Sequence, residues 1–453
     1  SMIRYRRSTL LQHLGSPLFR AFLAVVVFPP GKAFSQDIEY RGTLSSRVAV
    51  ETRDGNMQLG EVKFEPELAG TLTPNISFRI LGRLRGDTQD QIEPGDPGAQ
   101  SAARSDWNRR AFIVDNLDAE LREAYADIYA GDWFFRLGKQ QVVWGQADGL
   151  RVLDQVNPLS FREFTLGNFE DRRIPLWMAN LERSFRSVTV QFLWIPDHTY
   201  NEVPSTGTFR PTSPLLVPSP PTDFSGPIQA VQGNRPNRLI TDDDYGIRLT
   251  GFSHGWDWSL NGLYSYSDAP VISQQLADDG TLFIAPRYER SLLIGGSASN
   301  AFGKFTLRAE LGYATNRYVL INDPTDEDGV AKSSELSSVI GLDYQVNADT
   351  LFSSQLFLSV LPDNPNGAIR DQATGTLTLL ARRELRNDTI RVEGLLIQDL
   401  NQGDGVLQVS ANYELTSSVT LSAGVDVFYG TTNGIYGQFD QTDRITLGFE
   451  YGF

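Results

Sequence analysis

The 453-residue sequence contains no cysteine and only three histidines and three methionines. Without cysteine the chain has neither a lipoprotein anchor nor a disulfide framework, and it contains no zinc-binding constellation and no phosphate-binding glycine loop. Beyond the N-terminal segment, no stretch approaches about 18 uninterrupted apolar residues, so no transmembrane helix is predicted. The sequence therefore predicts no metal and no cofactor, and it leaves a soluble fold or a β-barrel as the possible architectures.

Residues 1–35 have the pattern of a cleavable export signal. Ser1 stands before the initiator methionine and is interpreted as a remnant of cloning, and four arginines precede or flank an apolar run at 21–28. That run is too short to span a bilayer, and residues 33–35 have the small-x-small pattern that signal peptidase cleaves. We expect this segment to be removed, which leaves one domain over 36–453. A frayed N-terminal helix of a cytosolic protein is the alternative.

The composition fits a barrel, because a barrel needs only one apolar face on each strand. Hydrophobic residues make up 40% of the chain and aromatic residues 11%. The predicted signal holds five basic residues and no acidic ones, so the mature chain has 35 basic and 55 acidic residues and a net charge of −20. This acidity argues against nucleic acid and anionic membrane surfaces as partners.

The C-terminal segment alternates with period two, which places alternate residues on opposite faces of a sheet. One face carries Ile445, Leu447, Phe449, Tyr451 and Phe453. The same alternation recurs at 305–313 and 407–415, with polar residues on the second face. A soluble sandwich can show this pattern too. A terminal aromatic on such a strand resembles the signal recognised by the barrel-assembly machinery, which we therefore expect as a partner through Phe453.

Eighteen strands are predicted, with sixteen as the alternative count. They are 38–53, 58–72, 75–87, 117–131, 132–145, 174–187, 188–198, 243–256, 257–268, 286–303, 304–320, 333–349, 350–362, 371–388, 389–402, 405–418, 419–432 and 442–453.

Short turns alternate with long connections between these strands. The long segments are 88–116, 146–173, 199–242, 269–285, 321–332, 363–370 and 433–441. This alternation is typical of an up-and-down outer-membrane barrel of a Gram-negative cell, with periplasmic turns and extracellular loops. The spacing therefore favours an all-β transmembrane barrel over a periplasmic sandwich, with both termini in the periplasm and outer-membrane lipid and lipopolysaccharide around it.

Charged residues follow one face of neighbouring predicted strands. The rows are Glu61, Lys63, Glu65 and Glu67, then Arg79, Arg83 and Arg85, and finally Glu120 and Arg122 with Asp118 if the alternation continues there. Opposite charges on adjacent strands can pair and hold a polar passage in shape. The alternative is that these pairs only brace the wall. The alternation weakens near 123–129, where we expect a bulge.

Two of the long segments are expected to do more than connect strands. Segment 199–242 contains eight prolines, too many for a regular element, and it is either a functional lid or a disordered part of the surface. Segment 146–173 mixes apolar and charged residues, which predicts a loop that folds inward and constricts the pore. A loop packed over the mouth of the barrel is the alternative.

A dense series of motifs covers roughly residues 120–198. The motifs lie at 136–145, 148–154, 156–158, 161–164, 169–171, 173–178 and 194–197. They resemble the proteobacterial outer-membrane family catalogued as a domain of unknown function, the thirteen-oh-two family. The resemblance implies a barrel of the porin-like superfamily, often encoded beside inner-membrane pumps of the resistance-nodulation-division type that move lipids or other hydrophobic compounds.

The resemblance also implies which residues shape the constriction. These are Trp144, Asp148, Arg151, Asp154, Asn157, Arg162, Glu163, Asp171 and Arg173. The alternative is that they serve only to fold the loop.

Catalysis is the competing class of function. Only His198 and His254 remain after removal of the predicted signal, and His198 follows Asp197 at the end of a strand. That pair would suit an outer-membrane protease, but the surrounding motifs of such enzymes are missing, and a histidine at a strand end is more often structural. We therefore predict no enzymatic activity.

We expect an outer-membrane channel, and the resemblance implies that it carries lipidic or amphipathic organic compounds in concert with an inner-membrane pump. Two alternatives remain open: a general diffusion porin for small polar solutes, and a surface barrel with a binding or structural role.

Overall fold

The computed structural model describes residues 38–89, 103–147, 149–220, 224–231, 233–323 and 326–453. The predicted signal at 1–35 and the predicted constriction residue Asp148 lie outside these residues.

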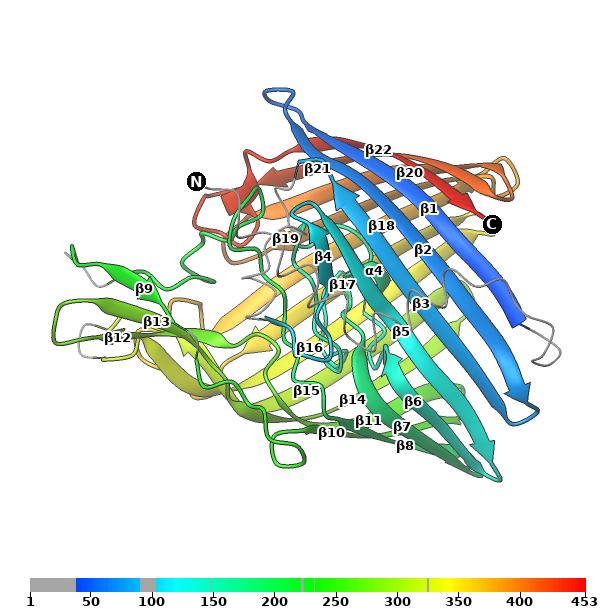
Figure 1. The fold of residues 1–453 in the computed structure, drawn as a ribbon, viewed down its shortest axis with the longest axis horizontal. Coiled ribbons are helices and arrows are strands. Elements are labelled where there is room, and N and C mark those ends of the chain that lie inside the picture. Colours follow the sequence, from blue (N-terminus) through cyan, green and yellow to red (C-terminus); the bar gives the residue numbers. More distant parts are fainter. Residues whose placement is uncertain (1–37, 90–102, 148, 221–223, 232, 324–325) are drawn as a thin grey trace, which may run out of the picture.

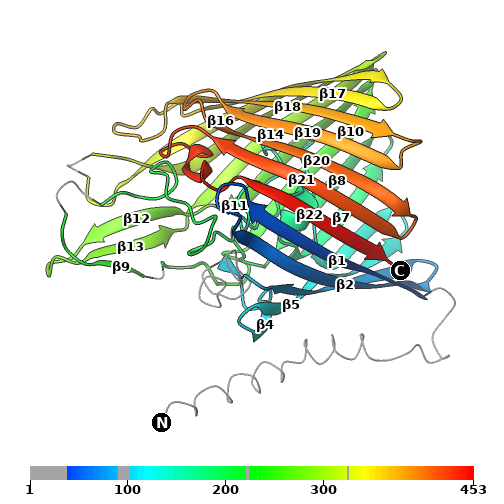
Figure 2. The same ribbon diagram turned by 90° about the horizontal axis from the view of Figure 1, so that it is seen from above.

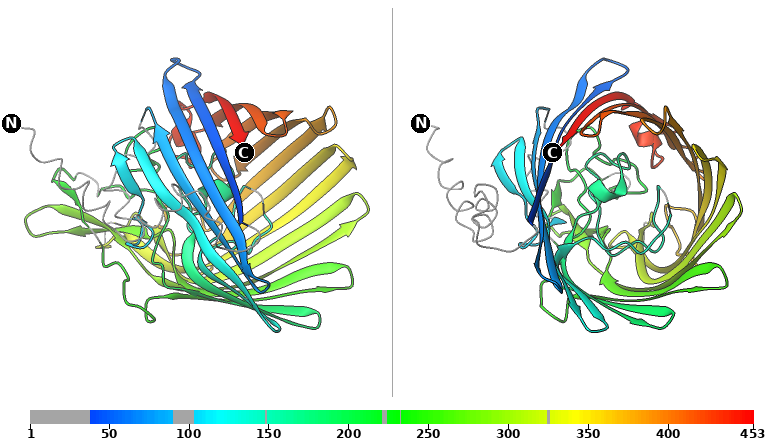
Figure 3. Two further views of the ribbon diagram at one scale, coloured as in Figure 1. Left: turned by 45° about the vertical axis from the view of Figure 1, so that its right-hand side comes forward. Right: turned by 90° about the vertical axis from the view of Figure 1, so that its right-hand side faces the viewer.

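One antiparallel sheet closes on itself into a barrel (Figures 1 and 3). Eighteen of its described strands form the wall, and β22 pairs back with β1 along nine residue pairs from Thr43↔Gly452 to Glu51↔Arg444. The wall strands are β1 (Ile38–Glu51), β2 (Met57–Thr73), β3 (Ile76–Asp87), β5 (Leu117–Ala130), β6 (Trp133–Gln140), β7 (Leu176–Phe185), β8 (Val188–Ile195), β10 (Asp244–Ser253), β11 (Trp256–Tyr266), β14 (Arg290–Phe302), β15 (Phe305–Leu320), β16 (Val330–Asn347), β17 (Thr350–Val360), β18 (Ala373–Leu385), β19 (Ile390–Asp399), β20 (Gly405–Thr416), β21 (Val419–Tyr429) and β22 (Arg444–Gly452). The predicted barrel and its strand count are confirmed.

The alternation in the sequence becomes two different faces of the wall. Large apolar side chains point outward and are exposed on strand after strand, among them Tyr40, Val62, Leu260, Ile294, Leu311, Ile340, Leu356, Leu407 and Leu447. A closed barrel pairs every backbone group within its own wall, so an apolar outer band can face lipid without unpaired edges. Among the described residues no helix has the length and apolar character needed to cross a bilayer.

The two ends of the barrel differ in their connections. Turns of two to four residues gather at the end that carries Phe453, here called the short-turn end, and the long segments gather at the other, the long-loop end (Figures 1 and 2). A small sheet of β9 (Ile228–Ala230), β12 (Val271–Leu276) and β13 (Leu282–Arg287) projects beyond the long-loop end (Figure 2).

This small sheet corrects the prediction for 269–285, which was expected to be a plain loop. Its alternation is too short to have been separated from turn residues in the sequence. The predicted bulge is found just before the expected stretch, where Leu81 pairs with Glu123 and Gly82 with Leu121, so that Arg122 is the extra residue on β5.

The wall is interrupted above β6. Strand β6 ends at Gln140, five residues before the predicted end, because the chain turns into the barrel there and returns at Leu176, the direct pairing partner of Gln140. Beyond β6, the upper part of β5 pairs instead with β4 (Ala111–Val114). Residues 141–175, called the plug below, are thus inserted between two neighbouring strands, and Figure 3 shows this cyan-to-green segment inside the ring of strands.

Candidate functional site

The plug is first held in shape by bonds within itself. Asn157 ties its two ends together, because its Oδ1 accepts from the Val142 N–H at 2.8 Å and its Nδ2 donates to the Ile174 carbonyl at 2.9 Å. Arg151 donates to the Asn157 carbonyl at 2.7 Å. The only α-helix among the described residues, α4 (Phe169–Arg172), is one turn long and is capped by the Asn168 side chain. A plug that folds on itself can act as one body inside the barrel.

Apolar side chains of the plug pack against a belt of inward-facing apolar residues on the wall, which we call the apolar collar. It comprises Ala49, Leu59, Leu176, Met178, Leu193, Ile195, Leu263, Leu293, Ala314, Val339, Phe357, Ile397, Val406 and Phe428. Three groups of plug residues meet it: Val142, Trp144 and Val156, then Val152 and Leu153, and then Phe164 and Leu166. Inward-facing apolar residues are unlike a water-filled pore, whose lining is polar.

Trp144 shows how closely the collar is fitted to the plug. Its side chain is 0% exposed, and its indole N–H donates to Gln191 Oε1 on β8 at 2.8 Å. The wall residue facing its ring is Gly246, where an added Cβ would lie 2.8 Å from the ring. Glycine at this position of β10 therefore makes room for the indole.

Glu310 on β15 holds the plug through its backbone. Its carboxylate accepts from the Gln146 N–H at 2.5 Å and from the Leu153 N–H at 3.2 Å. Next to it, Arg308 donates to the Gln146 carbonyl at 2.6 Å. Together the two residues fix the stretch of plug that faces β15.

On the opposite side the plug meets β1, β2, β3 and β22 through charged groups, which we call the ionic seam. Its plug members are Arg162, Glu163 and Asp171, and its wall members are Arg47, Glu61, Lys63, Arg83 and Arg444. The ion pairs are Arg162 with Glu61 at 2.6 Å, Glu163 with Arg444 at 2.8 Å, Asp171 with Lys63 at 3.1 Å, and the close pairs Glu163 with Arg47 and Asp171 with Arg83.

The carboxylates of the plug are strongly held in their charged form. Burial alone would raise the pKa of Glu163, but Arg47 and Arg444 outweigh it and lower the pKa to about 2. Burial would also raise the pKa of Asp171, but Arg83 and Lys63 lower it well below its usual range. Both groups are therefore anions at any physiological pH.

A polar cavity of about 490 Å³ lies beside the ionic seam, bounded by β1, β2, β3, β5 and the helical turn of the plug. Along the wall that lines it, the charged rows of neighbouring strands pair side by side: Arg83 with Glu65 at 2.8 Å, and Arg79 with both Glu67 at 3.0 Å and Glu123 at 2.7 Å. This part of the lumen is polar and shaped by ion pairs.

A second charged cluster fills the region where β6 is missing from the wall. Arg85 binds Asp118 at 2.8 Å, and Arg104 from the long-loop end reaches both Glu120 at 2.7 Å and Glu202 at 3.2 Å. All five side chains are at least nine-tenths buried. Because charges removed from water need partners, this network closes the gap in the strand wall.

The residues predicted to form the constriction fall into two groups. Trp144, Arg162, Glu163 and Asp171 contact the wall. The others that the structure describes, Arg151, Asp154, Asn157 and Arg173, bind within the plug, with Arg173 Nε donating to Asp154 at 3.1 Å. The inward fold predicted for 146–173 is confirmed. Whether its residues select a substrate stays a prediction.

The predicted charged rows are also divided. Glu61, Lys63 and Arg83 bind the plug, Glu65, Glu67 and Arg79 take part in pairs along the wall of the polar cavity, and Arg85 and Glu120 belong to the buried cluster. Arg122 donates to the Arg173 carbonyl of the plug at 3.0 Å.

Several residues that hold the plug were not predicted. Arg47 and Arg444 sit near the loop ends of the first and last strands, far apart in sequence, and only barrel closure makes them neighbours. Glu310 was visible as a polar residue on an alternating strand, but nothing in the sequence connected it to the plug. Phe164 packs with Phe428 and with Phe439, at a ring distance of 4.8 Å for the latter.

The proline-rich segment 199–242 is ordered in its described residues. Phe209 is 1% exposed and packs in the same aromatic group as Phe428 and Phe439, above the plug. His198 Nε2 lies 3.2 Å from Asp243 Oδ1. No group of histidine, aspartate and glutamate suited to a metal ion occurs in the described part of the chain.

Strand pairing, the apolar outer band and the inserted segment together define a transmembrane β-barrel with an internal plug, the kind of barrel found in bacterial outer membranes. The chain belongs to the family described as "Protein of unknown function (DUF1302)", whose model matches residues 62–453, and the predicted resemblance is thereby confirmed. Among curated proteins, none matches the sequence.

Solved structures with a similar chain path include variants of the porin from Rhodopseudomonas blastica. A double mutant has a TM-score of 0.41 and 12% sequence identity, covering 92% of this chain and 100% of the porin. A triple mutant of that porin has a TM-score of 0.42 and 12% identity, with the same coverage. These distant likenesses carry no functional argument, and the barrel described above rests on its own strand pairing.

Proposed function

We propose that the protein is an outer-membrane conduit that is closed at rest and opens when the plug moves. The observation that carries this proposal is the plug itself, which contacts residues on both sides of the barrel, from Arg47 on β1 to Phe357 on β17. A segment held by both the apolar collar and the ionic seam does not leave a wide path for free diffusion.

The cargo is a lipidic or amphipathic organic compound. The apolar collar supports this, because displacement of the plug would uncover apolar residues such as Leu263, Leu293 and Val339 inside the barrel. A hydrophobic compound can cover such surface with a gain of about 25 cal/mol for each Å² removed from water. The polar cavity beside the seam would accommodate a charged or hydrated part of the same molecule.

The short-turn end faces the periplasm and the long-loop end faces outward, as in outer-membrane barrels generally. Cargo then arrives from a periplasmic or inner-membrane partner, for which a pump of the resistance-nodulation-division type is the proposed candidate. Site-specific photo-crosslinkers at exposed short-turn positions such as Asp132 and Arg186 would capture such a pump in whole cells. Equal capture from long-loop positions such as Asp278 would count against this orientation.

The deciding experiment measures single-channel conductance of the mature chain in planar bilayers, with and without residues 146–173. Because Gln140 pairs directly with Leu176, a short glycine-serine linker can close the gap without disturbing the wall. The intact protein is expected to be silent and the deletion variant to conduct steadily. The matched control removes the outer hairpin 271–287, which lies outside the barrel, and keeps residues 146–173. This variant is expected to remain silent.

The main alternative is a general diffusion porin for small polar solutes, favoured by the polar cavity and its ion pairs. Steady conduction by the intact protein would support that alternative and overturn a closed conduit. A barrel that stays silent even without 146–173 would favour the third possibility, a surface barrel with a binding or structural role.

A further inference from the structure

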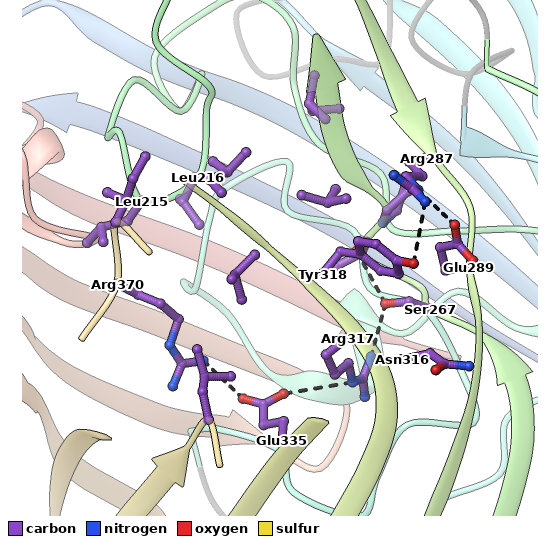
Figure 4. A pocket seen from close by; sticks show the side chains of 18 residues that line it. Leu215, Leu216, Ser267, Arg287, Glu289, Asn316, Arg317, Tyr318, Glu335 and Arg370 are labelled. Atoms are coloured by element: carbon purple, nitrogen blue, oxygen red, sulfur yellow. Dashed lines mark hydrogen bonds and ion pairs between the residues drawn. The ribbon is translucent and has the colours of Figure 1, made fainter. Parts of the chain in front are cut away.

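A second cavity, of about 360 Å³, opens at the long-loop end, away from the polar cavity and on the other side of the plug. It lies between the ends of β15, β16 and β17, the strand β12 and the leucines of the proline-rich segment (Figure 4). We call it the vestibule pocket. Its size is at the lower end of the range for small-molecule sites, about 300 to 1,000 Å³.

One flank of the vestibule pocket is apolar. It is formed by Leu215, Leu216, Val271, Ile272, Val319, Leu320, Leu361 and Ile369, which come from four separate parts of the chain. Leu216 remains 41% exposed, whereas Leu361 is 1% exposed and forms a closed base. At about 30 Å³ for each water-sized group, the cavity has room for roughly a dozen non-hydrogen atoms.

The facing flank carries two arginines that share a single carboxylate. Arg317 and Arg370 share one carboxylate, that of Glu335, which Arg370 binds at 3.1 Å and Arg317 approaches only to 3.8 Å (Figure 4). The buried Nε of Arg317 makes no hydrogen bond. The two guanidinium groups share this one carboxylate as their direct acidic partner, and Asp268 is a further acid near Arg317.

A third arginine at the rim is already neutralised. Arg287 binds Glu289 at 2.7 Å and Asp328 at 2.9 Å, and its guanidinium lies 4.3 Å from the centre of the Tyr318 ring. The three arginines of this flank thus meet three carboxylates in all, but Arg317 and Arg370, at the border between the polar and apolar flanks, share only one of them.

Arg317 also connects the pocket to the plug. Its Nη2 donates to Gln155 Oε1 of the plug at 2.8 Å, and its Nη1 donates to Ser267 Oγ at 3.0 Å. An anion bound at Arg317 would compete with Gln155 for the guanidinium, because a charged acceptor forms a stronger hydrogen bond than an amide oxygen. Occupation of the pocket would thus remove one of the bonds that hold the plug.

We infer that the vestibule pocket binds an amphiphile with a single negative charge, such as a carboxylate on an alkyl chain of about a dozen carbons, and that its head group engages Arg317 and Arg370. The inference rests on the proposed function for the amphipathic class of cargo, and it adds the charge of the head group and the place of binding. The alkyl chain lies over Leu320, Leu361 and Ile369.

The test uses dodecanoate carrying a photoreactive diazirine at its far end, added to the full mature chain in lipid nanodiscs. Labelling is expected in peptides that contain Leu216 and Leu361, as determined by mass spectrometry. Unlabelled dodecanoate should compete, whereas dodecanol and dodecyltrimethylammonium, which have the same chain length but a neutral or positive head, should compete at least tenfold more weakly.

Variants separate the two flanks of the site. Arg317→Gln and Leu361→Asn should each reduce labelling by at least fivefold, and Arg317→Lys, which keeps the charge, should restore most of it. The matched control is Arg382→Gln, which removes an arginine paired with Glu393 near the short-turn end of β18. Heat-dependent mobility in electrophoresis verifies that every variant keeps a closed barrel.

The inference is overturned if all three amphiphiles compete equally, if Arg317→Gln labels like the parent, or if labelling is confined to the outer apolar band. Labelling in a protein that conducts freely without any deletion would uphold the site while rejecting the closed conduit. A silent protein without specific labelling would leave the proposed function in place and reject the site.

Discussion

The plug is attached to the barrel by two regions of opposite chemistry, and their comparison indicates how it opens. At the apolar collar, separation exposes side chains such as Trp144 and Leu153 to water, and nothing in water replaces the lost contacts. At the ionic seam, separation exposes charges such as Glu163 and Arg444, whose hydration offsets much of the lost attraction. If the plug moves as proposed, we therefore expect the contacts of the seam to separate at a lower cost in free energy than those of the collar.

The two regions should also respond differently to conditions. Pairs in contact with water are screened by salt over a Debye length of about 8 Å at physiological ionic strength, whereas apolar contacts are not. The wet end of the seam is the Lys63 and Asp171 pair, since Asp171 is 41% exposed, and the buried end is Glu163 with Arg444. Salt should loosen the first and leave the second in place.

The largest effect is expected from Trp144→Ala, which removes a plug side chain that packs against the apolar collar. Removal of a fully buried tryptophan leaves a cavity and weakens the plug by about 3 to 5 kcal/mol. Bilayer recordings should show conducting events whose frequency does not depend on salt. The control is Trp256→Ala, which removes a tryptophan that contacts Phe302 at the short-turn end. If both variants stayed equally silent, the collar would not hold the plug.

The next largest effect is expected from Glu163→Gln in the seam. The change leaves Arg47 and Arg444 near each other without their shared carboxylate, a loss of about 3 kcal/mol. Conducting events should appear and should become more frequent as salt is raised, in contrast to the collar variant. Glu393→Gln, which breaks a wall pair away from the plug, is the matched control. The same salt response in collar and seam variants would remove the distinction between the regions.

A smaller effect is expected when an atom is added to the wall beside Trp144 instead of the indole being removed. Gly246→Ala places a Cβ 2.8 Å from the Trp144 ring, a strain of about 1 to 3 kcal/mol. Brief openings and a raised fluorescence of the shifted tryptophan should result. Gly394→Ala provides the control, because nothing lies within 4 Å of the added atom. Fluorescence unchanged from the parent would mean that the indole is not confined by the wall.

The smallest effect is expected from a change of pH. It should change the charge of Asp268 near the long-loop end and leave the charge of Glu163 in the ionic seam unchanged. Burial raises the pKa of Asp268 to about 7, although Arg151 and Arg317 oppose it. Because folding raises the pKa of Asp268, its protonated carboxyl adds to the free energy of unfolding. This contribution is complete below the ordinary pKa near 4 and is lost as the pH rises through 7. Glu163, with a pKa of about 2, keeps its charge throughout that range.

Thermal unfolding between pH 5 and 9 tests this difference. The parent protein should become slightly less stable as the pH rises through 7, and Asp268→Asn should remove that slope. Asp132→Asn, at an exposed turn, should keep it. A slope that persists in Asp268→Asn but disappears in Glu163→Gln would assign the titration to the seam instead.

Much of the barrel was predictable because lipid outside and the lumen inside impose a two-residue period on every strand. The eighteen predicted ranges each overlap one wall strand, and the inward course of 146–173 follows from its apolar residues. The early end of β6 at Gln140 was not predictable, because residues 141–144 contain two valines and a tryptophan, residue types favoured in strands, while they already belong to the plug.

The site was predictable only in part, for a similar physical reason. Local motifs revealed the residues of the plug, since they are close together in sequence. Their wall partners, such as Arg47, Glu310 and Arg444, are set by the register of strands hundreds of residues apart. Among the motif residues, Asn157 binds within the plug and Glu163 binds the wall, and their role in a constriction stays a prediction.

The position of Glu163 also bears on assembly. Its two arginine partners come from the first and the last strand of the wall, β1 and β22, which become neighbours only when the ring is completed. An unfinished barrel can therefore present Glu163 with only one of them. The complete latch thus requires both a closed ring and an inserted plug, so a chain that closes with the plug left outside lacks it and can be distinguished from a correctly assembled one.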